Sequence, residues 1–552
     1  MADAVPPRLT PGRDRIPLQQ RTIPRLLDGG ASRWPYRPAL RDAERTLTYA
    51  DLAAEADRHG SAIKALGIGW QEPILFMLDN HLDHVLSWLG ATYYGRVQAQ
   101  VNTAYLGGLL ANVLNNSGAE TIVVEEGYLP RLAAIAAEVP HLKRAVVRRS
   151  GSAAGARPAA DADSAGLAVL DFGEVFGAGP GGDREHDVEP WDRYGIMYTS
   201  GTTGPSKGVV QPHALPFSYV SPAHWPLVDE DDVALVTLPQ FHIAGQWTGV
   251  LAPLMVGGCA ALVPRFSASA FWDDVARFGA TQTVMIAAMA AFLMAQPEQP
   301  GDADTTLAKV LLAPIPAQAD YFMRRFGVLL TCGLGQTEAS APIAAPYGFT
   351  RPGACGWPRE DFDVRLVDAH DVEVARGEVG EMVVRAHDPW AAMLEYNKAP
   401  EATVRKWRNL WLHTGDMVRQ DETGQIFFVD RDSDVIRRRG ENISSVEVEA
   451  EVQKLPSVRL AAVVGVDSPD NEQEVKACVV PEPAARITEA ELHAILRDRL
   501  PYFMVPRYIE YYHELPQTPT HRVQKAELRL EGLTARSWDS REHGVEARRT
   551  GR

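Results

Sequence analysis

The chain has 552 residues, of which 45% are hydrophobic and 23% are charged, and its formal net charge at pH 7 is −16. This length is too great for one core and predicts two or more domains, and the composition is that of a folded globular protein. The acidic balance argues against broad nucleic-acid binding, and it requires a local cradle of N–H groups and cations for any anionic ligand.

The predicted elements along the chain begin with residues 1–45, which are rich in proline and arginine and are expected to wrap a surface. From residue 48 to residue 312, helical patterns alternate with apolar strand patterns, for example a helix over 48–67 and a strand over 73–78. Valine-rich segments with turns follow over 363–430, and a compact α/β unit follows residue 431. Such alternation predicts an α/β fold of mostly parallel, helix-covered sheets, with a β-rich subdomain and a small last domain.

The spacing of the cysteines and the length of the apolar stretches indicate where in the cell the protein is expected. The four cysteines are widely spaced and show neither CxxC nor zinc spacing, which favours a reducing cytoplasm over a disulfide framework. The start of the chain lacks a signal-peptide layout. The longest apolar stretch, residues 284–295, is too short to span a bilayer and is predicted to be a buried helix. We therefore expect a cytoplasmic protein with no integral membrane segment.

The most informative segment is residues 198–208, Tyr-Thr-Ser-Gly-Thr-Thr-Gly-Pro-Ser-Lys-Gly, which lies between two apolar runs. Glycines allow close backbone approach, and N–H groups, hydroxyls and an ammonium together bind anions. The spacing does not fit the nucleotide-binding pattern G-x-x-x-x-G-K-[ST]. A polar surface loop is the simpler alternative, but this density of hydroxyls, glycines and lysine favours a polyphosphate ligand.

Four further motifs follow in order, over residues 334–338, 414–416, 431–443 and 516–525. Together with residues 198–208 they resemble the motifs of the adenylate-forming superfamily, which includes acyl-CoA synthetases, adenylation domains and luciferases. Residues 437–445 look most like the carnitine-CoA-ligase-like branch of bacterial acyl-CoA ligases. The resemblance implies an N-terminal domain over 1–430, a hinge at 431–434 and a rotating C-terminal domain over 435–552.

The resemblance also implies a nucleotide site. Lys207 would bind pyrophosphate as a point charge. Glu338, with the hydroxyl of Thr202 or Thr203, would hold Mg²⁺, which shares its shell with phosphates and water. Asp416 would accept hydrogen bonds from the ribose hydroxyls, and Arg431 would help to hold the same ribose. Taken alone, Thr-Gly-Asp is also typical of a plain turn. The complete expected nucleotide and coenzyme A set is Thr199, Ser200, Gly201, Thr202, Thr203, Gly204, Lys207, Leu334, Gly335, Thr337, Glu338, Asp416, Arg431, Arg439 and Gly440.

Two further positions are assigned by the resemblance. His242 would touch or gate the carboxylate of the acid, with a satisfied core histidine as the alternative. Gly440 would line the channel for the pantetheine arm of coenzyme A. The neighbouring arginines, residues 437–439, would either meet its phosphates or form a solvated charge run, and both interpretations stay open.

Three departures from the family pattern matter. Arg522 stands where relatives carry a catalytic lysine, and Lys525, three residues on, is the alternative catalytic cation. Leu334 replaces the aromatic residue that stacks on adenine. Leu311 and Leu312 replace two glycines that border the acyl pocket in relatives, which favours a small or atypical acid.

The expected activity is an AMP-forming acid–thiol ligase, which activates an organic acid with ATP and Mg²⁺ and passes it to coenzyme A. Two alternatives stay open: an adenylate-forming ligase that uses an amine acceptor or an oxyanion such as nitrite, and a non-catalytic nucleotide-binding homologue. The expected partners are small molecules, and a homodimer stays open.

Overall fold

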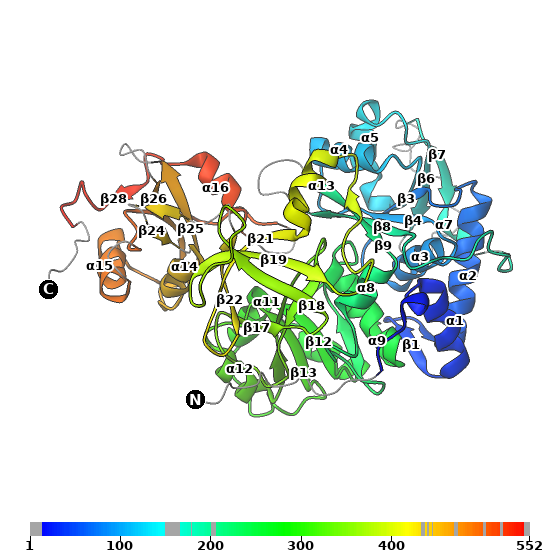
Figure 1. Cartoon of the computed structure of the whole chain (residues 1–552), viewed down its shortest axis with the longest axis horizontal. Coiled ribbons are helices and arrows are strands. Elements are labelled where there is room, and N and C mark those ends of the chain that lie inside the picture. The colour runs from blue at the N-terminus through cyan, green and yellow to red at the C-terminus, as the bar shows by residue number, and fades with distance from the viewer. Residues whose placement is uncertain are drawn as a thin grey trace. The chain divides into compact units, whose positions relative to one another are not determined.

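The computed structural model describes residues 14–149, 166–177, 179–199, 206–431, 436–438, 441–443, 445–467, 473–500, 504–518 and 523–545 (Figure 1). The chain forms two compact units. The first comprises Met1–Val364, Val383–Thr414 and Thr423–Ile426, and the second comprises Arg365–Met382, Gly415–Glu422 and Phe427–Arg552.

The first unit contains an eight-stranded sheet in the order β20-β9-β8-β4-β3-β5-β6-β7. Its core strands are parallel and buried on both faces, which is why β3 reads as a continuous apolar run, whereas β4 carries the buried glutamines Gln98 and Gln100. Helices α3 and α4 both pack on β3, and Figure 1 shows them on opposite sides of the sheet. The strands are β3 (Pro73–Met77), β4 (Val97–Gln100), β5 (Thr121–Glu125), β6 (Arg144–Arg148), β7 (Ala168–Asp171), β8 (Arg193–Thr199), β9 (Lys207–Pro212) and β20 (Glu395–Tyr396).

Helices around this sheet begin where the sequence provides caps. Helix α2 starts after Thr48, whose side chain forms a capping box with Asp51, and α3 starts after His81, which accepts a hydrogen bond from the His84 amide. The helices of this part are α1 (Ile23–Arg33), α2 (Tyr49–Ala65), α3 (Leu82–Tyr93), α4 (Gly107–Ser117), α5 (Leu129–Ala134) and α7 (Phe172–Phe176), with short 3₁₀ turns η1 (Leu18–Gln20), η2 (Glu126–Tyr128) and η3 (Ala136–Glu138).

The first unit also contains a seven-stranded sheet in the order β14-β13-β12-β10-β11-β1-β2. All of its pairs are parallel except β1 with β2. The strands are β1 (Pro38–Arg41), β2 (Thr46–Thr48), β10 (Val233–Val236), β11 (Cys259–Leu262), β12 (Gln282–Ile286), β13 (Lys309–Ala313) and β14 (Leu329–Thr331). The helices that follow along the chain are α8 (Ala214–Tyr219), the π-helix η4 (Ala244–Leu251), α9 (Ala252–Val256), α10 (Phe271–Phe278), α11 (Ala287–Met294), α12 (Ala319–Phe326), α13 (Pro400–Lys406) and the 3₁₀ turn η5 (Arg408–Leu410).

A β-rich part follows, as the valine-rich segments predict. The antiparallel strands β15 (Gly333–Gln336), β16 (Ser340–Ala344) and β17 (Ala354–Pro358) belong to the first unit. Four further strands cross the boundary between the units along the chain, namely β18 (Phe362–Val367), β19 (Val379–Ala386), β21 (Leu412–Gln420) and β22 (Ile426–Arg431).

The second unit ends in a four-stranded sheet ordered β25-β26-β27-β28, coloured orange to red in Figure 1. Its apolar core joins β25 and β26 to the buried faces of α14 and α15. The elements are β23 (Ile436–Arg438), β24 (Glu441–Ile443), α14 (Ser445–Gln453), β25 (Val458–Asp467), β26 (Gln473–Pro481), α15 (Glu489–Arg499), β27 (Tyr508–Tyr511), α16 (Lys525–Glu531) and β28 (Trp538–Asp539).

Two sequence predictions were wrong. The apolar stretch 284–295 is not one helix, because residues 284–286 belong to β12 and only residues 287–294 form α11. Residues 1–45 do not only wrap a surface, because α1 and β1 are ordinary secondary structure, and β1 pairs with β11. The short apolar run of β12 could not be distinguished from a helix by periodicity alone. None of the described helices combines the length and hydrophobicity that crossing a bilayer requires.

Candidate active site

The two ends of the predicted phosphate loop face each other across a hairpin. Strand β8 pairs antiparallel with β9, and Thr199 lies opposite Lys207 at its end. Both residues are half-buried. The connecting residues Ser200, Gly201, Thr202, Thr203 and Gly204 lie outside the described part of the chain. The hairpin therefore presents the loop at the end of a fixed pair of strands.

Helix α4 fixes both arms of this hairpin. On the β8 side, the Tyr198 hydroxyl lies 3.1 Å from both Val113 O and Asn116 Oδ1. On the β9 side, Asn112 Nδ2 donates to Ser206 O at 3.4 Å. Burial raises the pKa of Tyr198 well above its usual range, so its hydroxyl is a neutral donor.

The motif over 334–338 begins on β15 and ends in the turn before β16. Leu334 is half-buried and pairs with Ile343 of β16. Gly335 lies so close to β16 that a Cβ atom there would come within 2.8 Å of Ser340 O and 2.9 Å of the Tyr219 ring. A glycine is therefore required by packing at this position. Thr337 and Glu338 follow and are both buried.

Glu338 and Lys207 meet at one tyrosine. The Tyr396 hydroxyl donates to Glu338 Oε1 at 2.8 Å, and Lys207 Nζ lies 5.8 Å from the centroid of the same ring. Glu338 is 8% exposed, and no described residue donates a hydrogen bond to its second oxygen, Oε2. A nearly buried carboxylate with one oxygen still available suits a hard cation that takes its other ligands from phosphate and water.

The motif over 414–416 is tied to the same region through its first residue. Gln336 Nε2 donates to Thr414 O at 2.8 Å, and Lys406 Nζ lies 3.2 Å from that oxygen. Gly415 has a φ of +71°, which favours glycine, and its amide donates to Glu381 Oε1 at 2.9 Å. Asp416 is fully buried.

The side chain of His242 is exposed, so the alternative of a core histidine is wrong. Its Nδ1 accepts from the Ala244 amide at 3.2 Å. Asn80, at the end of β3, donates to Leu238 O at 2.8 Å and accepts from the Gln240 amide at 3.1 Å. The loop that carries His242 is thus held to the eight-stranded sheet.

Lys525 is engaged inside the second unit. Its Nζ lies 2.8 Å from Glu449 Oε1 and donates to Ser445 Oγ at 2.6 Å. Its side chain is 14% exposed. This arrangement makes Lys525 a brace between α14 and α16, and it favours Arg522, which lies outside the described residues, as the catalytic cation.

One of the three neighbouring arginines is structural. Arg438 Nε lies 2.6 Å from Glu474 Oε2, Arg438 Nη1 donates to Val505 O at 3.0 Å, and both charged side chains are buried. Arg438 is therefore unsuited to meeting an incoming phosphate. Arg439, Gly440 and the side chains of Arg431 and Arg437 lie outside the described part.

The profile of a family described as AMP-binding enzyme matches residues 27–396, and that of its C-terminal domain matches residues 447–522. The crotonobetaine/carnitine–CoA ligase of Citrobacter koseri is 30% identical, over 88% of this chain and 93% of its own. The same ligase of Salmonella typhimurium is 29% identical, with the same coverage. The chain belongs to the AMP-binding enzyme family. The predicted resemblance to its carnitine-CoA-ligase-like branch is confirmed.

Solved structures have the same fold as this AMP-binding enzyme. The anthranilate–CoA ligase AuaEII, in complex with anthranoyl-AMP, has a TM-score of 0.83 at 25% identity, with 94% of this chain and 98% of that one covered. The benzoate–CoA ligase of Burkholderia xenovorans has a TM-score of 0.80 at 24% identity, with 92% and 99% covered. The predicted fold class and the predicted enzyme class, an AMP-forming ligase of the acyl-CoA synthetase kind, are confirmed.

Sequence reasoning missed the residues that hold the motifs of this AMP-binding enzyme together. Tyr396, Asn116 and Asn80 are the clearest, because each contacts a motif far away in the sequence. The only local signal at Tyr396 is an aromatic residue between polar neighbours before Pro400. That pattern is typical of many turns and indicates no particular partner.

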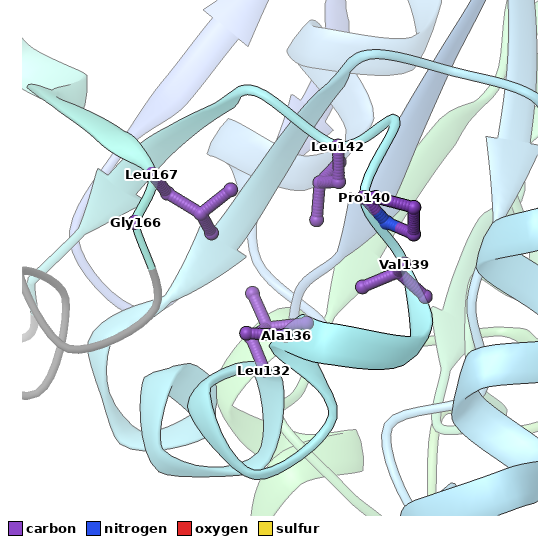
Figure 2. A pocket seen from close by; sticks show the side chains of 7 residues that line it. All are labelled: Leu132, Ala136, Val139, Pro140, Leu142, Gly166 and Leu167. Carbon is purple, nitrogen blue, oxygen red and sulfur yellow. The ribbon is translucent and has the colours of Figure 1, made fainter.

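A small cavity is lined by residues outside the motifs. Figure 2 shows it between Leu132 of α5, Ala136 of η3 and Leu167, with aliphatic side chains pointing into it. It is lined by Leu132, Ala136, Val139, Pro140, Leu142, Gly166 and Leu167. Among the described residues that line it, none has a charged or hydrogen-bonding side chain, so these residues offer nothing to orient a polar ligand.

Proposed function

We propose that this AMP-binding enzyme activates a small organic acid with Mg²⁺ and ATP and passes the acyl group to coenzyme A. The observation that carries the proposal is the meeting of Lys207, at the end of the phosphate hairpin, with the buried carboxylate of Glu338 across Tyr396. A cation and a metal-binding carboxylate beside a glycine- and hydroxyl-rich loop suit a triphosphate.

The first half-reaction is an in-line displacement at phosphorus. A carboxylate oxygen of the acid forms a bond to the α-phosphorus of ATP, and the bond from that phosphorus to the bridging oxygen of pyrophosphate breaks. Lys207 neutralises charge on the departing pyrophosphate, and the exposed His242 orients the acid. Mg²⁺, when bound by Glu338 and Thr202, supplies further charge neutralisation on the phosphates.

In the second half-reaction, the thiol sulfur of coenzyme A attacks the acyl carbonyl, its proton passes to solvent, and AMP leaves with the electron pair of the broken C–O bond. Asp416 and Arg431 hold the ribose, and Leu334 packs against the purine. Arg522 serves the first half-reaction, Gly440 lines the path of the pantetheine arm, and Arg439 meets a coenzyme A phosphate. The C-terminal domain, residues 435–552, rotates about 431–434 between the two steps.

The substrate is a small or atypical acid. Leu311 and Leu312 are both buried on β13 and stand where the family pattern has two glycines. Activity on long-chain fatty acids would contradict this assignment. We also propose a cytoplasmic location. The mass of the protein in solution would distinguish a monomer from a homodimer.

The test is a pyrophosphate-release assay with ATP, Mg²⁺ and a panel of acids that includes carnitine, crotonobetaine, benzoate, anthranilate and nitrite. Each acid is assayed alone, with coenzyme A, and with aromatic and aliphatic amines. We expect release that depends on one acid, and one thioester and one AMP per pyrophosphate when coenzyme A is present. Glu338→Gln should slow release by on the order of 100-fold. Release that ignores coenzyme A but yields an amide or a diazo product would favour the alternative acceptor. No release with any acid would overturn the proposal.

A further inference from the structure

Tyr396 touches both charged residues of the candidate nucleotide site. Its hydroxyl donates to Glu338 Oε1 at 2.8 Å, and the Lys207 ammonium lies 5.8 Å from its ring centroid. These two residues stand 131 positions apart in the sequence, and nothing in either motif anticipates a shared partner. One side chain therefore couples the predicted metal ligand to the predicted phosphate cation.

The backbone around Tyr396 is held on both sides. Tyr396 pairs with Val209 of β9, and the next residue, Asn397, donates its amide to Gly208 O at 2.7 Å. On the other side, the Met393 amide donates to Glu338 O at 2.8 Å. The segment over 393–397 is therefore a strap that joins the phosphate hairpin to the turn carrying Glu338.

The side chain of Tyr396 is fixed as firmly as its backbone. It is 7% exposed and packs in an apolar cluster with Val209 and Met393. Its amide donates to Thr403 Oγ1 at 2.9 Å. Asn397 and Asn116 exchange hydrogen bonds through Nδ2 and backbone oxygen at 2.7 and 3.0 Å, which ties the strap to α4.

We propose that Tyr396 is a positioning residue for the metal–nucleotide site, with separate roles for its hydroxyl and its ring. The hydroxyl donates a hydrogen bond to Glu338 Oε1 and so orients the carboxylate with Oε2 toward the position of Mg²⁺. The ring face attracts the Lys207 ammonium and places it for the terminal phosphates. This inference rests on the proposed function, because Glu338 and Lys207 act on Mg²⁺ and ATP only there.

The two roles predict different defects. Tyr396→Phe keeps the ring and removes the hydroxyl, so it should raise the Mg²⁺ concentration needed for ATP binding by about 10- to 100-fold, as loss of a partner of a metal ligand does. Binding of ATP in EDTA should stay within about twofold, because the ring still places Lys207. Tyr396→Leu removes both groups and should also weaken ATP binding in EDTA, by about threefold or more.

The measurement is isothermal titration calorimetry of ATP into the full chain at a series of free Mg²⁺ concentrations and in EDTA, with thermal unfolding as a check of folding. Tyr93→Phe is the matched control, because Tyr93 is also buried and donates to a carboxylate, that of Asp28, away from the motifs. We expect the control to keep the Mg²⁺ dependence of the wild type.

The outcomes separate this inference from the proposed function. A Tyr396→Phe variant with wild-type Mg²⁺ dependence would overturn the positioning role, whatever the activity of the wild type. A shifted Mg²⁺ dependence in a protein that releases no pyrophosphate with any acid would support the positioning role and sink the ligase assignment. A wild type that binds no ATP would overturn both.

Discussion

At the scale of single residues, cationic side chains that look equivalent in the sequence have different surroundings in the structure. Lys525 and Arg522 are both cations near the end of the chain, and Arg437, Arg438 and Arg439 form one run. The structure gives Lys525 a carboxylate at 2.8 Å and buries Arg438 against Glu474. A cation that already has a buried partner must give up that interaction before it can serve a substrate.

This difference can be tested at Lys525. We expect Lys525→Met to lower the melting temperature, because it leaves Glu449 without its cation, at a cost of about 1–3 kcal/mol. The same variant should slow adenylation far less than Arg522→Met does. Thermal unfolding and acid-dependent pyrophosphate release measure the two effects.

The control for this test is Glu449→Gln together with the double variant, because a genuine pair makes the stability losses non-additive. The opposite pattern would show that Lys525 is the catalytic cation. In that case Lys525→Met would abolish adenylation at an unchanged melting temperature.

At the scale of elements, a buried chain of glutamines joins the π-helix η4 to the eight-stranded sheet. Gln246 Nε2 donates to Gln98 Oε1 at 2.9 Å and Gln98 Nε2 donates to Gln246 Oε1 at 3.0 Å, and the Tyr194 hydroxyl also donates to Gln246 Oε1, at 2.6 Å. All three side chains are fully buried. A π-helix is rare and is often found at a functional site. Here it begins two residues after His242.

We expect Gln246→Leu to raise the KM for the acid by about tenfold while the KM for ATP changes little. The substitution leaves Gln98 and Tyr194 with unsatisfied buried groups, which cost about 1–3 kcal/mol each, and the loop carrying His242 relaxes with η4. Initial-rate kinetics with each substrate varied in turn measure the split. Gln282→Leu is the matched control, since Gln282 is equally buried but lies on β12 of the other sheet. Equal effects of the two variants on both KM values would contradict the role of η4.

At the scale of the whole molecule, buried histidines link stability to pH. Burial lowers the pKa of His59 to about 3 and that of His213 to about 3, and both side chains lie in the first unit. The unfolded chain binds these protons near the ordinary pKa of 6.5, whereas the folded chain does not. The stability they contribute is therefore complete above pH 6.5 and is lost as the pH falls from 6.5 toward 3.

Each buried histidine should contribute a slope of about 1.4 kcal/mol per pH unit to the free energy of unfolding between pH 6.5 and pH 4. We expect His59→Asn to lower the free energy of unfolding at every pH. The pH slope of that free energy should fall by the contribution of one histidine, about 1.4 kcal/mol per pH unit. Urea unfolding at pH 7, 6 and 5, followed by tryptophan fluorescence, measures the slope. An unchanged slope in the variant would show that His59 is protonated in the folded chain.

The sequence by itself determined the order of the motifs, the family and the most strongly patterned helices and strands, because these depend on short patterns of hydrophobicity, glycine and hydroxyl placement. Helix α2 with its capping box and strand β3 are found from such patterns alone. The tertiary structure decided which polar residues meet. That Tyr396 joins Lys207 to Glu338 depends on the pairing of β20 with β9. That Lys525 is paired with Glu449 depends on the packing of both α14 and α16 against β25. Such contacts are decided by the register of distant segments, which no local pattern encodes.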